Sequence, residues 1–461
     1  MINYYSKFLK KINNYFASER KLLILIFATA FLIRLAFLIT YQDQKLLRNE
    51  YFEQDTKLYT HMAESLRLHE KPDAVNLKDP NYPARLIGLG YPLFLAALFT
   101  IFGKSFLMVR IIQVFLGAIT CLLLYWLGKE IFDRVHGIAA AVILAFDPFH
   151  IYRTGSILTE VIFVFLLTAS LLCLYKGINS KNIYSFVLGN VFLIFAGLCR
   201  VAAFGMYPFI LLWLLLILWR DKLKMIRYVA CVLVFSFLII FLWQFILPAF
   251  YPSEQSGPVS KCTQEVNVFN KLVVFPVNLF VAMSSSTHLG ITHSKYHDWR
   301  VKLYDSTKDL PNCEARKKTT DEFFIFLKKN PALIINVIYQ KFINFWRVYP
   351  NAQEPGKPLT EFGGVKYKII SLLSYGVILP FFILGLFILV KAWKKMFLLY
   401  SLIFIFVCIH VIQCSQIRYR LQIIPAFIIF ASFGLIWSVK SIITHFNIMR
   451  HRIFNSGGII K

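Results

Sequence analysis

The sequence predicts an all-α protein that crosses a membrane about ten times. Its 461 residues are 58% hydrophobic and 17% aromatic, and only 16% are charged. This composition lies well outside that of soluble domains. Several apolar runs reach the roughly 20 residues that a helix needs to cross a bilayer. Short basic segments separate many of these runs, which is typical of cytoplasmic loops.

The predicted spans follow one another along most of the chain. The third is the shortest, and it reaches span length only if it continues to Phe149 or beyond. In chain order the predicted spans are 21–41, 106–127, 136–147, 157–175, 183–199, 204–219, 226–249, 367–390, 397–414 and 421–439.

The basic segments predict the orientation. MINYYSKFLKKINNYFASERK, WRDKLKMIR, VKAWKK and MRHRIFNSGGIIK alternate correctly if both termini are cytoplasmic. Residues 42–105 and 250–366 then face outward, the first with eight acidic and eight basic residues. We expect a multi-pass protein of a bacterial inner (plasma) membrane, whose first run is too long for a cleaved signal peptide. The net charge of +26 is explained by these loops and by anionic lipid, so no nucleic-acid partner is predicted.

Three parts are predicted. Residues 1–249 form an N-terminal transmembrane catalytic module, which includes the first outer loop. Residues 250–366 form a large outer segment, in which 330–350 is read as interfacial because Lys341 and Arg347 interrupt its apolar run. Residues 367–461 form C-terminal spans and a cytoplasmic tail.

The first outer loop begins with an amphipathic helix at residues 50–68. Leu58, Met62 and Leu66 share one helical stripe, and Asp55 falls in the middle of it. A carboxylate at the boundary of lipid and protein is costly unless it faces a cavity, so Asp55 is a functional candidate. The alternative is a local ion pair with Lys57 or Arg48.

The same loop continues as KDPNYPARLIGLGYPLFLAALFTIFGKS, where Pro83 and Pro92 favour a short interfacial or re-entrant helix over a full span. Arg85 stands at its head. An arginine there either extends to the interface without a role or holds a lipid phosphate.

Two further outer turns carry charged residues. In AFDPFHIYRTGSILTEVIF, Asp147 precedes Pro148 and Glu160 opens a span; turn formation and helix capping are the alternatives to a function for these acids. In QCSQIRYRLQIIPAF, Arg418 and Arg420 lie on the outer side. They suit an anionic headgroup or pyrophosphate, unless they only extend to the interface.

Cysteine and metal patterns predict little chemistry. Of eight cysteines, six lie in or beside predicted spans, where packing explains them. Cys262 and Cys313 share the large outer segment, where a disulfide would be stable under oxidising conditions. HSKYH at 293–297 lacks the Glu of HExxH, and no Cys/His spacing indicates zinc. No cofactor is predicted, and a divalent metal stays open.

The motifs occur in a specific order: QDTKLYTHMAESL, GYPLFLAALFTIFGKS, ILTEVIF, GLCRVAA, FWRVYP and RYRLQIIPAF. This order resembles that of bacterial polyprenyl-phosphate-sugar glycosyltransferases of the GT-C class, which are related to protein O-mannosyltransferases and the lipid A aminoarabinose transferase. The resemblance covers nearly the whole chain.

The resemblance implies a multi-span enzyme whose site lies in the first outer loop. Asp55 would be the general base, and Glu160 an accessory acid. Arg85, Arg418 and Arg420 become candidates for binding the donor phosphate. Three further accessory candidates are Tyr59, Asp147 and Arg200.

Two features depart from these relatives. Protein O-mannosyltransferases have an Asp-Glu pair in the first loop and an extra lumenal domain, whereas Asp55 is followed by Thr56 and no such domain follows. The aminoarabinose transferase has a Lys before its Pro-containing segment, where this chain offers Arg85 at an offset that the sequence does not fix. The acceptor therefore stays open between a lipid, a glycan and a protein.

The expected reaction is an inverting transfer of a hexose or pentose from a polyprenyl-phosphate donor. Asp55 would deprotonate the acceptor, and arginines would stabilise the departing phosphate. Two alternatives remain: a lipid-linked glycan polymerase or ligase with its residues in 250–366, and a transporter or flippase. A transporter favours acids near mid-membrane, and the predicted spans are nearly free of them there.

Overall fold

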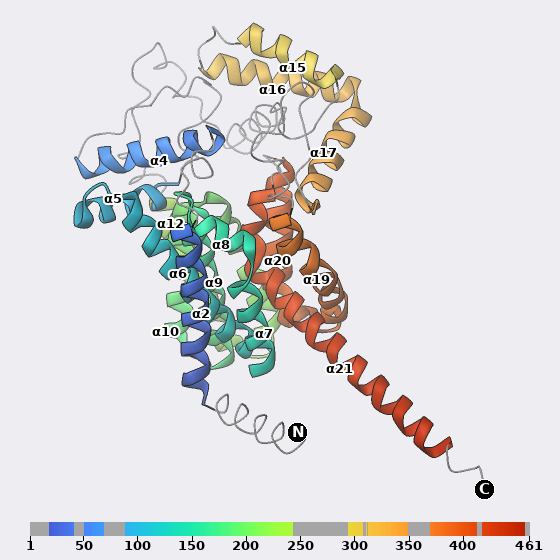
Figure 1. Ribbon diagram of the computed structural model, residues 1–461. Coiled ribbons are helices and arrows are strands. Elements are labelled where there is room, and N and C mark those ends of the chain that lie inside the picture. The colour runs from blue at the N-terminus through green and yellow to red at the C-terminus, as the bar shows by residue number, and fades with distance from the viewer. Residues whose placement is uncertain are drawn as a thin grey trace.

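The chain folds into a bundle of long helices with a layer of shorter helices across one end (Figure 1). Every regular element in the described ranges is helical, so the predicted all-α fold is confirmed. The computed structural model describes residues 18–40, 50–68, 88–242, 294–307, 310, 312–348, 369–412 and 417–456.

Each predicted span coincides with a helix of the bundle, some of them preceded by a turn of 3-10 or π helix. The short elements are η2 (Val201–Gly205), η8 (Leu372–Gly376) and η9 (Leu389–Ala392). The long helices are α2 (Glu19–Thr40), α6 (Phe106–Ile131), α7 (Arg134–Ala145), α9 (Glu160–Asn179), α10 (Ile183–Cys199), α11 (Met206–Leu218), α12 (Lys222–Phe241), α19 (Val377–Ile388), α20 (Trp393–Ile412) and α21 (Ile424–Ser456).

The count of ten spans is not confirmed. In the described part of the chain, 7 helical stretches are long and apolar enough to cross a membrane, or up to 8 if one bent pair is a single span. One of the seven stretches runs from Ile369 to Ile412. Within it the Tyr400 hydroxyl donates to the carbonyl of Leu386 at 2.7 Å. A straight helix would separate these residues by about 21 Å, so the chain reverses at η9 and the stretch holds two helices.

The third predicted span is interrupted rather than extended. α7 ends at Ala145, and α8 (Pro148–Thr154) follows at an angle of 57°. Asp147 caps α8 by accepting a hydrogen bond from the backbone N–H of His150 at 3.1 Å, and Pro148 suits the first helical position. The short third run in the sequence therefore reflects a bent pair of helices.

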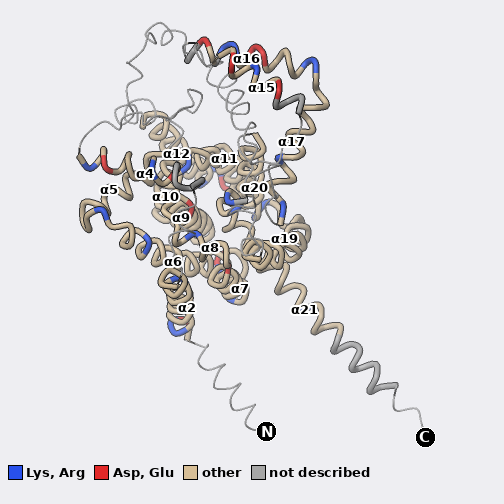
Figure 2. Tube along the Cα trace, turned by 45° about the horizontal axis from the view of Figure 1, so that its top comes forward, with Lys and Arg blue, Asp and Glu red and all other residues tan. Residues whose placement is uncertain are grey.

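The end layer contains the segments that were expected to face outward. It comprises α4 (Glu50–Arg67), α5 (Gly90–Phe102), α15 (Ser294–Thr307), α16 (Asn312–Lys329) and α17 (Pro331–Trp346). The first residue of α2 and the last part of α21 lie at the opposite end of the bundle (Figure 1). Charged positions mark α15 and α16, whereas α19 carries none (Figure 2). The segments that were expected to face outward thus share one end of the bundle.

Two apolar cores follow from this arrangement. The main core includes residues of α2 and α21 and of most helices between them. Helices α15 to α17 enclose a separate small cluster: Leu303, Phe323, Phe326, Leu333, Ile334 and Val337. We call α15, α16 and α17 the outer unit. α17 joins it to the bundle, because Nζ of Lys341 donates a hydrogen bond to the carbonyl of Ile412, the last residue of α20, at 3.1 Å.

Candidate functional site

Asp55 is joined to the far end of the chain. Its Oδ2 accepts a hydrogen bond from Nη1 of Arg418 at 2.9 Å, and 33% of the Asp55 side chain is exposed against 11% of Arg418. Arg418 belongs to η10 (Ile417–Ile423), which precedes α21. The local ion pair with Lys57 is not among the contacts that Asp55 makes in the described ranges. The acid lies on the packed face of α4 because an arginine meets it there.

α4 is fixed by packing and by one backbone contact. Met62 and Ala63 are buried, and the hydroxyl of Thr56 donates to the carbonyl of Ile157 at 3.3 Å. The Tyr59 ring packs edge-on against Tyr91 of α5, with centroids 5.2 Å apart. Tyr59 thus helps to hold α4 and α5 together.

Tyr91 also orders the loop between α8 and α9. Its hydroxyl donates to Oε1 of Gln113 at 2.9 Å. The Gln113 amide donates in turn to the carbonyls of Ser156 at 2.7 Å and Thr154 at 3.1 Å. Burial and then the negative charge of Glu160 hold the pKa of Tyr91 well above its ordinary value, so the hydroxyl remains a donor.

A second acid–arginine pair lies beside this loop. Glu160 opens α9 and is only 2% exposed. Its Oε1 lies 3.0 Å from Nη2 of Arg200, and Nε of Arg200 donates to the hydroxyl of Thr159 at 2.9 Å. Neither carboxylate oxygen of Glu160 has an aligned hydrogen bond from a described residue. Glu160 and Arg200 therefore form an ion pair, and the carboxylate oxygens of Glu160 can still accept hydrogen bonds.

Tyr419 joins the two pairs into one cluster. Its hydroxyl accepts a hydrogen bond from Nη2 of Arg418 at 3.0 Å. The guanidinium carbons of Arg418 and Arg200 lie 4.9 and 5.5 Å from its ring centroid. We call Asp55, Glu160, Arg200, Arg418 and Tyr419 the acid–arginine cluster.

Among the described residues, arginines gather around the two carboxylates of the cluster. Arg153, which is 1% exposed, acts electrostatically on Glu160, as do Arg200 and Arg418. Guanidinium groups gathered at one end of the bundle suit an anionic ligand.

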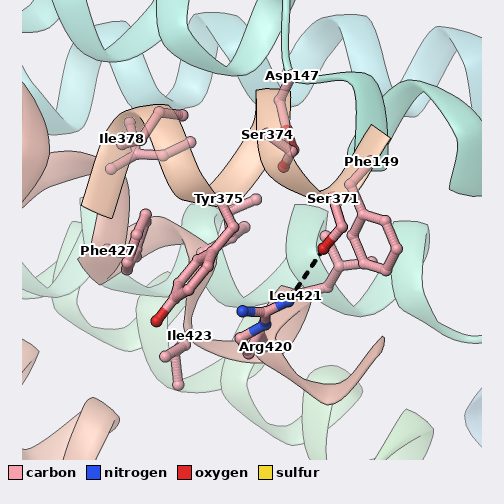
Figure 3. A pocket seen from close by; sticks show the side chains of 12 residues that line it. Asp147, Phe149, Ser371, Ser374, Tyr375, Ile378, Arg420, Leu421, Ile423 and Phe427 are labelled. Carbon is pink, nitrogen blue, oxygen red and sulfur yellow. Dashed lines mark hydrogen bonds between the residues drawn. The ribbon is translucent and has the colours of Figure 1, made fainter. Parts of the chain in front are cut away.

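The Arg420 side chain lies at a small cavity rather than in the acid–arginine cluster. It is one wall of a small cavity of about 30 Å³ that Asp147, Ser371, Ser374 and Tyr375 also line (Figure 3). The Arg420 guanidinium carbon lies 3.8 Å from the centroid of the Tyr375 ring. The structure thus separates Arg420 and Asp147 from Asp55 and Arg418.

Arg420 also contacts the outer unit. Its Nη1 donates to the carbonyl of Arg347, just after α17, at 2.6 Å. Nη2 reaches the hydroxyl of Ser371 at 3.5 Å. These contacts tie the end of α17 to η10.

Some predicted residues lie outside the described ranges. Arg85 and Cys262 are among them, and the side chain of Cys313 is as well. In the described part of the chain no group of three or more His, Cys, Asp or Glu side chains could hold a metal ion.

Three buried or clustered residues were not among the candidates taken from the sequence: Arg34, Arg153 and Tyr419. Arg34 had a clear signal, because it is a charge inside the first predicted span. Arg153 stood in the quoted turn FHIYRTGS with nothing to distinguish it from an arginine that extends to the interface. Tyr419 had no signal, since a tyrosine near the interface is ordinary.

Comparison with known proteins relates part of the chain to one family. The sequence pattern of the family described as dolichyl-phosphate-mannose-protein mannosyltransferase matches residues 88–243. This range includes Glu160 and Arg200 but neither Asp55 nor Arg418. No curated protein sequence matches the chain.

Solved structures show the fold. The oligosaccharyltransferase of Archaeoglobus fulgidus tethered with an acceptor peptide aligns with a TM-score of 0.50 at 15% identity, over 92% of this chain and 50% of that one. The oligosaccharyltransferase AglB from Archaeoglobus fulgidus in complex with an inhibitory peptide and a dolichol-phosphate gives 0.48 at 15% identity, over 95% and 52%. The chain spans about half the length of these proteins. The GT-C fold is confirmed, and with it the resemblance that the motif order predicted.

Proposed function

We propose that the protein is an inverting membrane glycosyltransferase that moves a sugar from a polyprenyl-phosphate donor to an acceptor hydroxyl. The observation that carries this proposal is the contact between Asp55 and Arg418 beside the Glu160–Arg200 pair. The matching family is named for a lipid-linked sugar donor, dolichyl-phosphate-mannose, which supports a donor of that class. The acceptor would be a lipid, a glycan or a protein on the outer face of a bacterial plasma membrane.

The cluster suits the two demands of the reaction. Asp55 would take the proton of the acceptor hydroxyl as the acceptor oxygen attacks the anomeric carbon. The bond between that carbon and the phosphate oxygen breaks, and the lipid phosphate leaves with the negative charge. Arg418 and the surrounding positive charge would stabilise it. One displacement inverts the anomeric carbon, and no second nucleophile is needed.

The Asp55–Arg418 contact implies an order of events. While Arg418 donates to Asp55, one oxygen of the carboxylate is occupied by the guanidinium. An entering donor phosphate would compete for the same guanidinium. Exchange of partners would place the phosphate on Arg418 and release Asp55 for the acceptor.

Glu160 suits a binding role better than proton transfer. It is 2% exposed, and its oxygens have no aligned hydrogen bonds from described residues. A buried carboxylate without such bonds is costly. Hydroxyls of the donor sugar would supply them, with Arg200 balancing the charge of Glu160. We retain Arg85 as a further phosphate ligand on the resemblance alone, and we assign Arg420 to the junction with α17.

The test compares two carboxylates at the same end of the protein. Purified protein in nanodiscs receives a panel of polyprenyl-phosphate hexoses and pentoses with a membrane lipid extract as acceptor. Release of polyprenyl phosphate is measured by mass spectrometry. Asp55→Asn keeps the shape of the side chain but not its basicity, so the rate should fall by about 10²–10⁴-fold. Asp298→Asn, at an exposed position on α15, should leave the rate unchanged.

Two results would count against the proposal. If folded Asp55→Asn protein transfers sugar at the wild-type rate, the base lies elsewhere, and Glu160 is the next candidate. If protein in liposomes moves labelled donor to the other leaflet without consuming it, the protein is a flippase.

A further inference from the structure

One aromatic side chain contacts both arginines of the acid–arginine cluster. The Tyr419 hydroxyl accepts from Arg418 at 3.0 Å, and both guanidinium carbons lie within 5.5 Å of its ring centroid. Distances below about 6 Å are those of attractive cation–π contacts. The two arginines hold different carboxylates, Asp55 and Glu160. Tyr419 therefore contacts the arginine of each acid–arginine pair.

The Tyr419 ring is itself fixed from behind. The imidazole of His410, on α20, stacks on it with centroids 4.4 Å apart and planes at 6°. Nε2 of His410 lies 3.0 Å from Oε1 of Gln422, and His410 and Gln422 are both buried. The ring of Phe345 from α17 is also nearly parallel to that of His410, with centroids 6.0 Å apart. Parallel rings on three elements leave Tyr419 little freedom to turn.

The two ends of the Arg418 guanidinium have different partners. Nη1 donates to Asp55, and Nη2 donates to Tyr419. Asp55 is one-third exposed, so a ligand can reach the contact on that side. If a phosphate replaces the carboxylate, only Nη1 changes its partner. The bond to Tyr419 can persist through the exchange and keep the guanidinium plane in place.

We propose that Tyr419 is a positioning residue that holds Arg418 in place while its partner changes from Asp55 to the phosphate of the lipid donor, and that the same ring orients Arg200 toward Glu160. This rests on the proposed function. Tyr419 acts through the arginines and needs no contact with the sugar. Its hydroxyl accepts a hydrogen bond from Arg418, whereas its ring contacts both arginines. Substitutions can therefore separate the two contributions.

The experiment uses two substitutions in the full-length protein in nanodiscs. Tyr419→Phe keeps the ring and removes the acceptor hydroxyl. Loss of a hydrogen bond to a charged group should raise the donor KM roughly tenfold, with kcat changed by less than about threefold. Tyr419→Leu also removes the ring contacts, so the donor KM should rise further and kcat should fall. Tyr375→Phe makes the same change at the tyrosine beside Arg420 and should leave both constants unchanged.

A binding measurement makes the test independent of turnover. Polyprenyl phosphate without sugar is titrated into each variant, and its Kd is measured. Tyr419→Phe should weaken binding about tenfold, and Tyr375→Phe should not. Melting temperatures are measured for both variants, and Kd is determined well below the lower of them, which separates positioning from a general loss of stability.

The outcomes are distinguishable. An unchanged KM and Kd in Tyr419→Phe overturn the positioning role, whatever the Leu variant does. If wild-type protein binds polyprenyl phosphate and only the Tyr419 variants lose affinity, but no donor is ever consumed, the positioning role is supported and the proposed reaction is wrong. If wild-type protein binds no polyprenyl phosphate, both are overturned.

Discussion

At the scale of single residues, Arg34 shows how a charge is accommodated inside the first span. It is fully buried. Nη1 donates to the carbonyls of Ala30 at 3.0 Å and Ala145 at 3.2 Å. Nη2 donates to the carbonyl of Leu144 at 2.9 Å and lies 3.1 Å from Nδ1 of His150. The last carbonyls of α7 lack the donors that a continuing helix would provide, and Arg34 donates to two of them where the chain bends.

Replacing Arg34 should therefore destabilise the bend. Arg34→Met keeps the length and apolar stem but removes every donor. Because each hydrogen bond from a charged group is worth about 1.5–3 kcal/mol, the free energy of unfolding should fall by at least about 3 kcal/mol. Thermal unfolding in detergent would report this, with Arg34→Lys intermediate. Arg67→Met, at an exposed position in the last turn of α4, is the control. Equal melting temperatures for both Met variants would show that the bend does not need Arg34.

At the scale of elements, α19 and α21 approach each other backbone to backbone. A Cβ at Gly385 would lie 2.0 Å from the carbonyl oxygen of Phe430, and one at Gly434 would lie 2.0 Å from that of Phe381. No side chain fits at such distances. Small residues allow this close contact between helices in a bilayer, where hydrophobic burial does not drive association.

Gly434→Val should push the two helices apart. Overpacking of a tight contact costs about 1–3 kcal/mol, and the nearest atom is rigid backbone, so the upper part of that range is expected. Thermal unfolding in detergent measures the loss. Val439→Leu adds bulk to an exposed part of the same helix and should have little effect. A Gly434→Val protein as stable as Val439→Leu would mean that the helices can separate freely.

At the scale of the whole molecule, contacts between distant helix ends define two ends of the bundle. Glu19, Lys129 and Tyr125 meet at one end, where Glu19 accepts from both side chains. The acid–arginine cluster and α17 mark the other end. We propose that the cluster end faces outward and that the end with Glu19 is cytoplasmic, because the basic loops lie with Glu19.

Thiol labelling tests this orientation. In a background without native cysteines, Lys317→Cys on α16 should react with an impermeant thiol reagent in intact cells. Lys222→Cys, at the start of α12, should react only after permeabilisation. Both positions are exposed, so accessibility alone does not explain a difference. Labelling of Lys222→Cys in intact cells would reverse the orientation and place the cluster on the cytoplasmic side.

The sequence by itself determined that the protein is all-α, and it located most of the long helices and their order. Apolar length and loop charge are local properties, and the bilayer acts on each helix in turn. Asp55 was found in the same way, because an acid on an apolar stripe can be recognised within one helix.

Only the tertiary structure decided which side chains meet. Arg418 and Arg420 looked equivalent in the sequence, yet one reaches Asp55 and the other the carbonyl of Arg347. Residues two apart on a 3-10 helix of three residues per turn point about 120° away from each other. The partner of Asp55 lies 363 residues away, and the rotation of η10 that brings it there is set by packing against α9, α17 and α20. Local periodicity fixes the face that a residue occupies, whereas the partner on that face depends on how all the helices pack.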